Sequence, residues 1–222
     1  MTSGRPVALL LDFDGTAATE NVGMALIQKF ARDDSWRVID EDYVNSRVGS
    51  RTAYELLGPL LTGGPEEWRA YVLENHSLDP SLAELLRRAR SAGWLVEILS
   101  DGLDLYIDAL LEKAGIEIAV YCASLKKDGD DAGIVWPYLN PLCGRCGTCK
   151  AERISDLSKS GYYVIFVGDG FSDLCAAPGA DLIFAKDVLA DHLREKEVPH
   201  RTFATLADLV GPLFGPDEPE RN

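Results

Sequence analysis

The 222-residue sequence predicts an α/β fold, with a parallel sheet covered by helices and a small helical insert after the first strand. Short apolar runs alternate with longer helical patterns along most of the chain, which is the order of strand–helix–strand units. The apolar runs are continuous rather than alternating, as expected for strands that are buried on both faces of a parallel sheet. One stretch near the N-terminus has helical patterns but no convincing strand, and it predicts the insert.

Five apolar runs are predicted as strands of the sheet. In chain order they are Val7–Leu11, Leu95–Leu99, Ala119–Ala123, Tyr163–Val167 and Leu182–Ala185. Helical patterns between them include Pro80–Ala92, Leu103–Ala114 and Val188–Glu197. The first of these is the clearest, because Asp79 suits the N-cap, Pro80 fits the first helical position and Gly93 fits the stop.

The predicted insert covers residues 19–77, where helical patterns lie at Met24–Phe30, Thr52–Leu61 and Pro65–Asn75. Residues 1–18 and 78–212 are therefore assigned to the α/β core. A second irregular stretch begins with the turn-rich run Lys126–Gly133, which suits the tip of a hairpin. From Gly211 onward the chain is rich in Gly, Pro and charge, so we expect a frayed end and assign residues 213–222 as a flexible tail.

The composition excludes two classes of function. Lys and Arg total 22 and Asp and Glu total 36, so the formal net charge is −14. A chain this acidic lacks the basic surface that DNA or RNA binding needs. No apolar run reaches the roughly 18–20 residues that span a bilayer, and the N-terminal run lacks the pattern of a signal peptide. We therefore expect a cytoplasmic monomer or homodimer with neither nucleic-acid nor membrane partners.

Four polar clusters carry the functional prediction, because ligands of open α/β sheets bind beyond the carboxyl ends of the strands. The clusters are Asp12–Thr16 (DFDGT), Ser100–Gly102 (SDG), Lys150 at the start of a helical pattern, and Gly168–Asp173 (GDGFSD). Each one alone has an ordinary explanation as a turn, a loop or a surface lysine. Together they supply carboxylates for a hard cation, a hydroxyl and amides for an oxyanion, and a lysine. A site that binds Mg²⁺ and a phosphate needs these carboxylates for the cation and these donors for the phosphate.

The four clusters resemble the four motifs of the haloacid dehalogenase superfamily of phosphohydrolases, and they span most of the chain. The resemblance implies a Rossmann-like core with a cap over the site. It also implies a Mg²⁺-dependent phosphatase that hydrolyses a small phosphorylated metabolite through an aspartyl-phosphate intermediate.

The resemblance assigns a role to each motif residue. Asp12 would be the nucleophile, Asp14 the general acid and then base, and Lys150 would steady the nucleophile and the phosphoryl charge. The phosphate would bind Ser100, Asp101, Gly102 and Lys150. The Mg²⁺ would bind Asp12, Asp169 and the Asp14 carbonyl, with Asp173 assisting.

An insert after Asp14 is typical of the phosphoserine phosphatase-like branch of this superfamily. A closer resemblance is to 2-hydroxy-3-keto-5-methylthiopentenyl-1-phosphate phosphatases of methionine salvage, through Tyr121–Ala123, Trp136-Pro137 and the cysteine cluster that ends in Cys149-Lys150. Those enzymes commonly have Tyr-Cys-Asn, Trp-Pro-His and Ser-Gly-Gly, so Ala123, Tyr138 and Asp101 depart from their pattern. The resemblance therefore indicates the branch and leaves the natural substrate open.

Three charged residues of the insert are candidates for substrate specificity, namely Glu20, Arg47 and Arg51. An acid and an arginine would hold an amino or carboxylate group of the substrate. Solvated charges on a polar face explain them equally well.

Cysteines form a separate candidate metal site. Cys143, Cys146 and Cys149 are three residues apart, which is typical of metal ligands, and Cys122 is the candidate for the fourth ligand of a structural Zn²⁺. Reduced thiols in a loop are the simpler alternative.

Two other functions use the same motifs. One is a catalytically idle module that binds a phospho-ligand or a metal, and the intact motif positions argue against it. The other is a phosphoryl transferase such as a mutase, which shares the carboxylate chemistry and differs only in the acceptor. Turnover separates the first alternative from a phosphatase.

Overall fold

The fold is a seven-stranded sheet with helices on both faces, seen in the computed structural model, which describes residues 4–128 and 131–215. The strand order is β4-β3-β2-β1-β5-β6-β7, and every neighbouring pair is parallel except β3 and β4. The strands are β1 (Val7–Leu11), β2 (Leu95–Leu103), β3 (Ala119–Asp128), β4 (Asp131–Val135), β5 (Tyr163–Gly168), β6 (Leu182–Ala185) and β7 (Arg201–Thr202). The predicted α/β class is confirmed.

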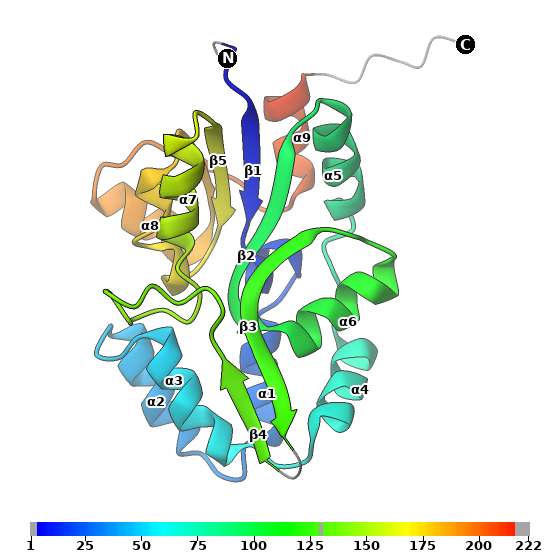
Figure 1. Cartoon of the computed structure of the whole chain (residues 1–222), viewed down its shortest axis with the longest axis vertical. Coiled ribbons are helices and arrows are strands. Elements are labelled where there is room, and N and C mark those ends of the chain that lie inside the picture. Colours follow the sequence, from blue (N-terminus) through cyan, green and yellow to red (C-terminus); the bar gives the residue numbers. More distant parts are fainter. Residues whose placement is uncertain (1–3, 129–130, 216–222) are drawn as a thin grey trace.

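Both faces of the sheet are buried, which explains the continuous apolar runs in the sequence. Along β1, Leu9 and Leu11 belong to one apolar core, and Ala8 and Leu10 belong to another. The first core is completed by helices α5 (Leu82–Ser91), α6 (Asp104–Ala114) and α9 (Ala207–Phe214), and the second by α7 (Lys150–Lys159) and α8 (Asp187–Glu195). Figure 1 shows α5 and α9 on one side of β1, and α7 and α8 on the other.

The helical insert forms a cap below the carboxyl ends of the strands in Figure 1. It contains α1 (Val22–Phe30), α2 (Trp36–Val44), α3 (Ser50–Leu57) and α4 (Pro65–Asn75), and a small core of Ile27, Trp36, Ala53 and Leu57 joins α1, α2 and α3. An isolated antiparallel bridge between Ala18 and Leu78 closes its two ends. The predicted junctions at 18/19 and 77/78 flank this bridge.

Three local predictions need correction or extension. Helix α2 was not predicted: its apolar face is the short row Trp36, Ile39 and Tyr43, of which only Trp36 is buried, and charged residues lie between them. The predicted hairpin exists as β3 paired with β4, although its tip at 129–130 lies outside the described residues. The chain is not frayed from Gly211, since α9 continues to Phe214, whose ring lies 4.8 Å from that of Trp94 between centroids. The rest of the predicted tail, 216–222, lies outside the described residues.

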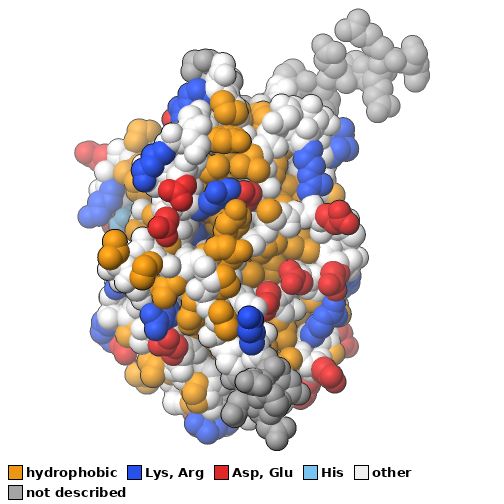
Figure 2. Space-filling view, viewed as in Figure 1, with side chains coloured by type: hydrophobic (Ala, Val, Ile, Leu, Met, Phe, Trp, Pro, Cys, Tyr) orange, Lys and Arg blue, Asp and Glu red, His pale blue; other side chains and the backbone are white. Residues whose placement is uncertain are grey.

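The surface is mixed in charge. On the face shown in Figure 2, basic side chains are dispersed among acidic and apolar ones and do not form a continuous basic surface. In the described part of the chain, none of the helices combines the length and apolar character that a bilayer crossing requires.

Candidate active site

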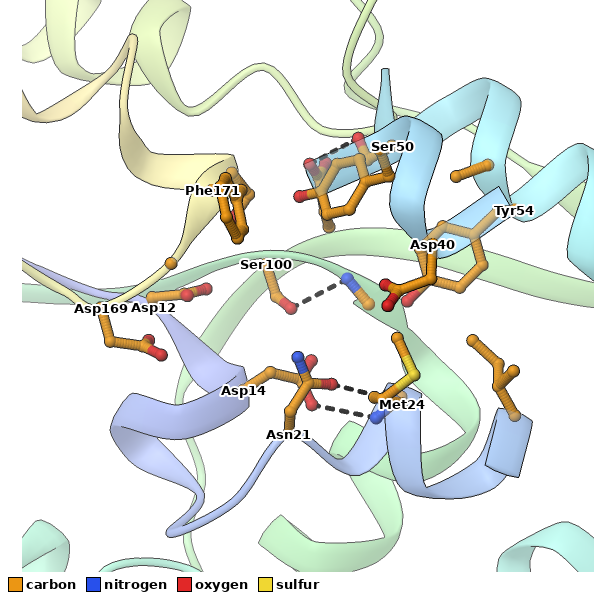
Figure 3. Close-up of a pocket in the computed structure, with 18 of the residues that line it drawn as sticks. Asp12, Asp14, Asn21, Met24, Asp40, Ser50, Tyr54, Ser100, Asp169 and Phe171 are labelled. Carbon is orange, nitrogen blue, oxygen red and sulfur yellow. Dashed lines mark hydrogen bonds between the residues drawn. The ribbon is translucent and has the colours of Figure 1, made fainter. Parts of the chain in front are cut away.

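The four motifs meet at the carboxyl ends of β1, β2 and β5, where the cap covers a cavity of about 280 Å³ (Figure 3). The motif residues that line it are Asp12, Asp14, Ser100, Asp101, Gly102, Asp169, Gly170, Phe171 and Ser172. They come together because parallel strands present their carboxyl ends at one edge of the sheet. The cap contributes the opposite wall, through residues of α1, α2 and α3.

Asp12 lies directly after β1 and is held in place by both its backbone and its side chain. Its backbone N–H donates to the Val167 carbonyl at 2.8 Å, which continues the pairing of β1 with β5. Its Oδ1 accepts hydrogen bonds from the Phe13 amide at 2.7 Å and from Lys150 Nζ at 2.6 Å. Among the described residues, Oδ2 has no protein donor. One oxygen of this buried carboxylate is therefore fixed, and the other is available to a ligand.

Lys150 is the first residue of α7 and is almost completely buried. Its Nζ donates to Asp12, to Ser172 Oγ at 2.9 Å and to Asp173 Oδ1 at 2.7 Å, so all three N–H hydrogens are in use. Desolvation alone would lower the pKa of this ammonium group, but Asp12, Asp173 and Asp101 raise it well above its usual value. Lys150 therefore stays charged, and it fixes the carboxylates around it.

Three carboxylates form a group suited to a cation. Oxygen atoms of Asp12, Asp169 and Asp173 lie within 4.8 Å of one another, and no other group of three such ligands exists in the described residues. Burial and the neighbouring Asp173 raise the pKa of Asp169 to about 7, and burial raises that of Asp12 well above its usual value. Thr16 donates to Asp169 Oδ1 at 2.8 Å. This concentration of negative charge fits Mg²⁺, which prefers carboxylate oxygens.

Asp173 mainly positions the other residues. Its Oδ2 accepts from the Asp169 and Gly170 amides at 3.0 and 3.1 Å, and its Oδ1 accepts from Lys150. Gly15 brings the loop after β1 against Asp169. It has a φ of 75°, and a Cβ atom there would overlap the Asp169 carboxylate. The glycines of the first and fourth motifs thus permit the close approach of the acids.

Asp14 lies one turn away and contacts the start of the cap. Its Oδ1 accepts from the Val22 and Gly23 amides at 2.7 and 3.1 Å, and its Oδ2 accepts from the Tyr106 hydroxyl at 2.7 Å. Burial raises the pKa of this carboxyl, although these hydrogen bonds partly oppose the effect. A raised pKa favours a carboxyl that can carry a proton. The Tyr54 hydroxyl of the cap interacts with that of Tyr106, which connects Asp14 to the cap.

Ser100, Asp101 and Gly102 lie in the last part of β2, where the register with β3 shifts. Ser100 Oγ accepts from the Gly102 amide at 2.9 Å, which leaves its hydroxyl hydrogen free for a ligand. The Asp101 carboxylate is fully engaged, because it accepts from Ser50 Oγ at 2.6 Å and from the Thr148 amide at 2.7 Å. Asp101 therefore connects the core to the cap and to the loop before α7.

A family model for haloacid dehalogenase-like hydrolases matches residues 9–178. The chain belongs to this family. Its curated relatives include the 2-hydroxy-3-keto-5-methylthiopentenyl-1-phosphate phosphatases of Brevibacillus brevis, 27% identical over 93% of this chain and 94% of the relative, and of Geobacillus kaustophilus, 26% identical over 94% and 96%. This hydrolase also shares its fold with a phosphoserine phosphatase whose structure represents an analogue of the phospho-aspartyl intermediate. The two structures match with a TM-score of 0.68 and 16% sequence identity, over 94% of this chain and 99% of the phosphoserine phosphatase. The resemblance found in the sequence is confirmed.

The cap wall of this hydrolase contains residues that the sequence did not single out. Asp40 and Tyr43 come from the unpredicted helix α2, and Ser50 and Tyr54 come from α3. Tyr43 meets Phe171 of the core with ring centroids 6.0 Å apart, in an edge-on arrangement. No local pattern marks these residues, because only the tertiary fold brings α2 and α3 over the motifs.

The three predicted specificity residues do not line the cavity. The Glu20 carboxylate lies 3.1 Å from His76 Nδ1 at the junction of cap and core. Arg47 pairs with Asp42 and Glu41, and Arg51 pairs with Glu55 at 2.9 Å, all on exposed cap surfaces. Both arginines therefore match the alternative that they are solvated charges on a polar surface.

The four cysteines do not assemble the predicted zinc site in the described structure. Cys122 is buried on β3 beside Asp104 and Asp108. The Cys146 thiol interacts with Cys175, which follows the fourth motif. All five cysteines are free thiols.

Proposed function

We propose that this hydrolase is a Mg²⁺-dependent phosphatase that hydrolyses a small phosphomonoester through an aspartyl-phosphate on Asp12. The observation that supports the proposal most directly is the asymmetry of the Asp12 carboxylate. Oδ1 is held by Lys150 and the Phe13 amide, whereas Oδ2 has no protein donor. A carboxylate oriented in this way is suited to attack phosphorus with Oδ2.

The phosphoryl group needs donors that leave the nucleophile free. The hydroxyl of Ser100 donates to a phosphate oxygen, because its lone pair already accepts from the Gly102 amide. Lys150 acts through its charge, since its three hydrogens are bound to Asp12, Ser172 and Asp173. Asp12 and Asp169, with Asp173 behind them, are the residues that would hold Mg²⁺, which would neutralise the charge of the phosphate.

Asp14 handles the proton in both halves of the reaction. In the first half, Asp12 Oδ2 bonds to phosphorus, the bond from phosphorus to the alcohol oxygen breaks, and Asp14 gives its proton to that oxygen. In the second half, water attacks phosphorus while Asp14 accepts its proton, and inorganic phosphate leaves Asp12. The buried position that raises the pKa of Asp14 supports the first of these roles.

The test is phosphate release from p-nitrophenyl phosphate with and without Mg²⁺, for the wild type and for Asp12→Asn. We expect the wild type to need Mg²⁺ and the variant to lose essentially all activity. Asp33→Asn is a matched control, because it changes an exposed cap aspartate. Equal turnover in the wild type and in Asp12→Asn would remove Asp12 as the nucleophile. A phosphoenzyme trapped in acid-quenched wild type and absent from the variant would support the intermediate.

A further inference from the structure

The cap side of the cavity has a wall of distinctive composition, here called the distal wall and defined as Asp40, Tyr43 and Tyr54. Figure 3 draws Asp40 beside Tyr54, across the cavity from Asp12 and Asp169. A substrate with its phosphate at Asp12 therefore directs its alcohol part toward this wall. The cavity volume of about 280 Å³ limits that part to a small group.

Asp40 has no partner within the described protein. No hydrogen bond or ion pair among the described residues involves its carboxylate, and the two arginines nearest to it in the sequence are engaged elsewhere. Arg37 pairs with Asp34 at 3.2 Å and lies over the Trp36 ring, and Arg47 pairs with Asp42. Burial raises the pKa of Asp40, and no neighbouring cation opposes this effect. A partly buried carboxylate without a partner is costly unless a ligand supplies one.

The charge of the cavity determines which ligand group complements Asp40. Besides Asp40, the lining contains Asp12, Asp14, Asp101, Asp169 and Asp187, and no Lys, Arg or His of the described chain lines it. Lys150 and the cation site compensate charge at the phosphate end only. A carboxylate at the distal wall would meet repulsion, and a hydroxyl would leave the charge of Asp40 in place. An ammonium group satisfies both the hydrogen bond and the charge.

The aromatic rings favour the same group. Tyr43 and Phe171 meet edge to face with centroids 6.0 Å apart, and Tyr54 lies beside Asp40. The faces of Tyr and Phe rings attract cations, and this attraction is stronger in a site shielded from water. An acid with neighbouring aromatic rings is a common way to bind ammonium groups.

We propose that the substrate is a small phosphomonoester whose alcohol part carries an ammonium group, which Asp40 and the aromatic rings of the distal wall bind. This inference rests on the proposed phosphatase function and names the class of its substrate. It assigns Asp40 as a specificity residue and predicts that zwitterionic amino-alcohol phosphates are preferred over neutral or carboxylated ones.

The experiment compares two probes of nearly equal size, O-phosphoethanolamine and n-propyl phosphate, which differ in an ammonium group against a methyl group. With Mg²⁺ present, we expect kcat/KM of the wild type to be at least about tenfold higher for O-phosphoethanolamine. Asp40→Asn should remove this preference, because it should lower kcat/KM for O-phosphoethanolamine far more than for n-propyl phosphate. Glu41→Gln is the matched control, because it removes an exposed charge on the next residue of α2 and should keep the preference. O-phospho-L-serine should be a poorer substrate than O-phosphoethanolamine.

A binding measurement separates failure of this inference from failure of the proposed function. Calorimetric titration of Asp12→Asn and of Asp12→Asn/Asp40→Asn with both probes reports recognition without turnover. Tighter binding of O-phosphoethanolamine that depends on Asp40 supports the inference even where turnover is absent, an outcome that would count against the phosphatase proposal alone. Wild-type turnover with equal or better use of n-propyl phosphate overturns the inference and leaves the phosphatase proposal standing. An unchanged preference in Asp40→Asn does the same.

Discussion

The Tyr106 hydroxyl donates a 2.7 Å hydrogen bond to Oδ2 of Asp14, across the boundary between α6 and the loop after β1. Tyr106 has one hydroxyl hydrogen and gives it to Asp14, and the Tyr54 hydroxyl of the cap interacts with the same Tyr106 hydroxyl. The orientation of the candidate proton donor thus depends on both the core and the cap.

Tyr106→Phe tests this dependence. We expect kcat to fall about tenfold for an alkyl phosphate, because Asp14 loses one of its three hydrogen-bond donors and its orientation. The fall should be smaller for p-nitrophenyl phosphate, whose leaving group needs little protonation. Steady-state kinetics with both substrates measure the difference. Tyr71→Phe, a cap tyrosine outside the cavity, should affect neither, and an equal loss on both substrates in Tyr106→Phe would contradict the assignment.

Gly49→Ala should disturb the closed cap. Gly49 precedes α3 and lies against the Arg145 carbonyl, which accepts from the Arg51 amide, and an added Cβ would overlap that carbonyl. We expect kcat/KM to fall about tenfold because the cap no longer seats on the loop before α7. Gly58→Ala is the control, since nothing lies near its added Cβ. Equal kinetics for both variants would show that this contact does not position the cap.

Mg²⁺ should stabilise the folded protein. Without an ion, the carboxylates of Asp12, Asp169 and Asp173 repel one another within 4.8 Å. At a Mg²⁺ concentration of about 100 times Kd, linkage predicts about 2.7 kcal/mol of added stability, which corresponds to a rise in Tm of about 5–10 °C. Asp169→Asn should have at least the Tm of metal-free wild type and a much smaller response to Mg²⁺. Differential scanning calorimetry in EDTA and in MgCl₂ measures the Tm of both proteins. An equal rise in Tm with Mg²⁺ in the wild type and in Asp169→Asn would contradict the assignment of Asp169 as a metal ligand.

Cys122 should resist alkylation in the native protein. Burial raises the pKa of this thiol to about 12, so at pH 8 only about 1 in 10,000 molecules carries the reactive thiolate. The exposed Cys143 should react freely under the same conditions. Iodoacetamide labelling followed by peptide mass spectrometry measures both alkylation rates. Unfolding in urea should make the two rates similar, because it exposes Cys122. Protection of Cys143 that EDTA removes would instead favour the zinc hypothesis.

Arg153→Ala should cost considerable stability. Glu97 is buried in the middle of β2, and Arg153 of α7 binds both of its carboxylate oxygens, at 2.8 and 2.5 Å. Removing the arginine leaves a buried charge without a partner, which costs about 3 kcal/mol in the free energy of unfolding. Urea denaturation measures the loss. Arg194→Ala, which breaks the exposed pair with Asp191, should change the unfolding free energy by less than about 0.5 kcal/mol.

The sequence allowed the core and the motif half of the site to be predicted, because both depend on local patterns. Val7–Leu11 had to be a buried strand, and Asp12 had to lie at its carboxyl end. The cap half has no such pattern. Helix α2 has only a short apolar face and buries only Trp36, so Asp40 and Tyr43 could not be placed. The hydrogen bond from Ser50 to Asp101 joins residues 51 positions apart, so it depends on how the cap packs against the core.

The bridge between Ala18 and Leu78 places the two ends of the cap side by side. A short loop is enough to join those ends. The cap between them can therefore be shortened, enlarged or replaced during evolution while the strand order of the sheet stays the same. A descendant that lost it would expose the acidic centre to bulky phosphorylated macromolecules. The size of the molecules that reach Asp12 would therefore depend on the segment inserted between these two residues.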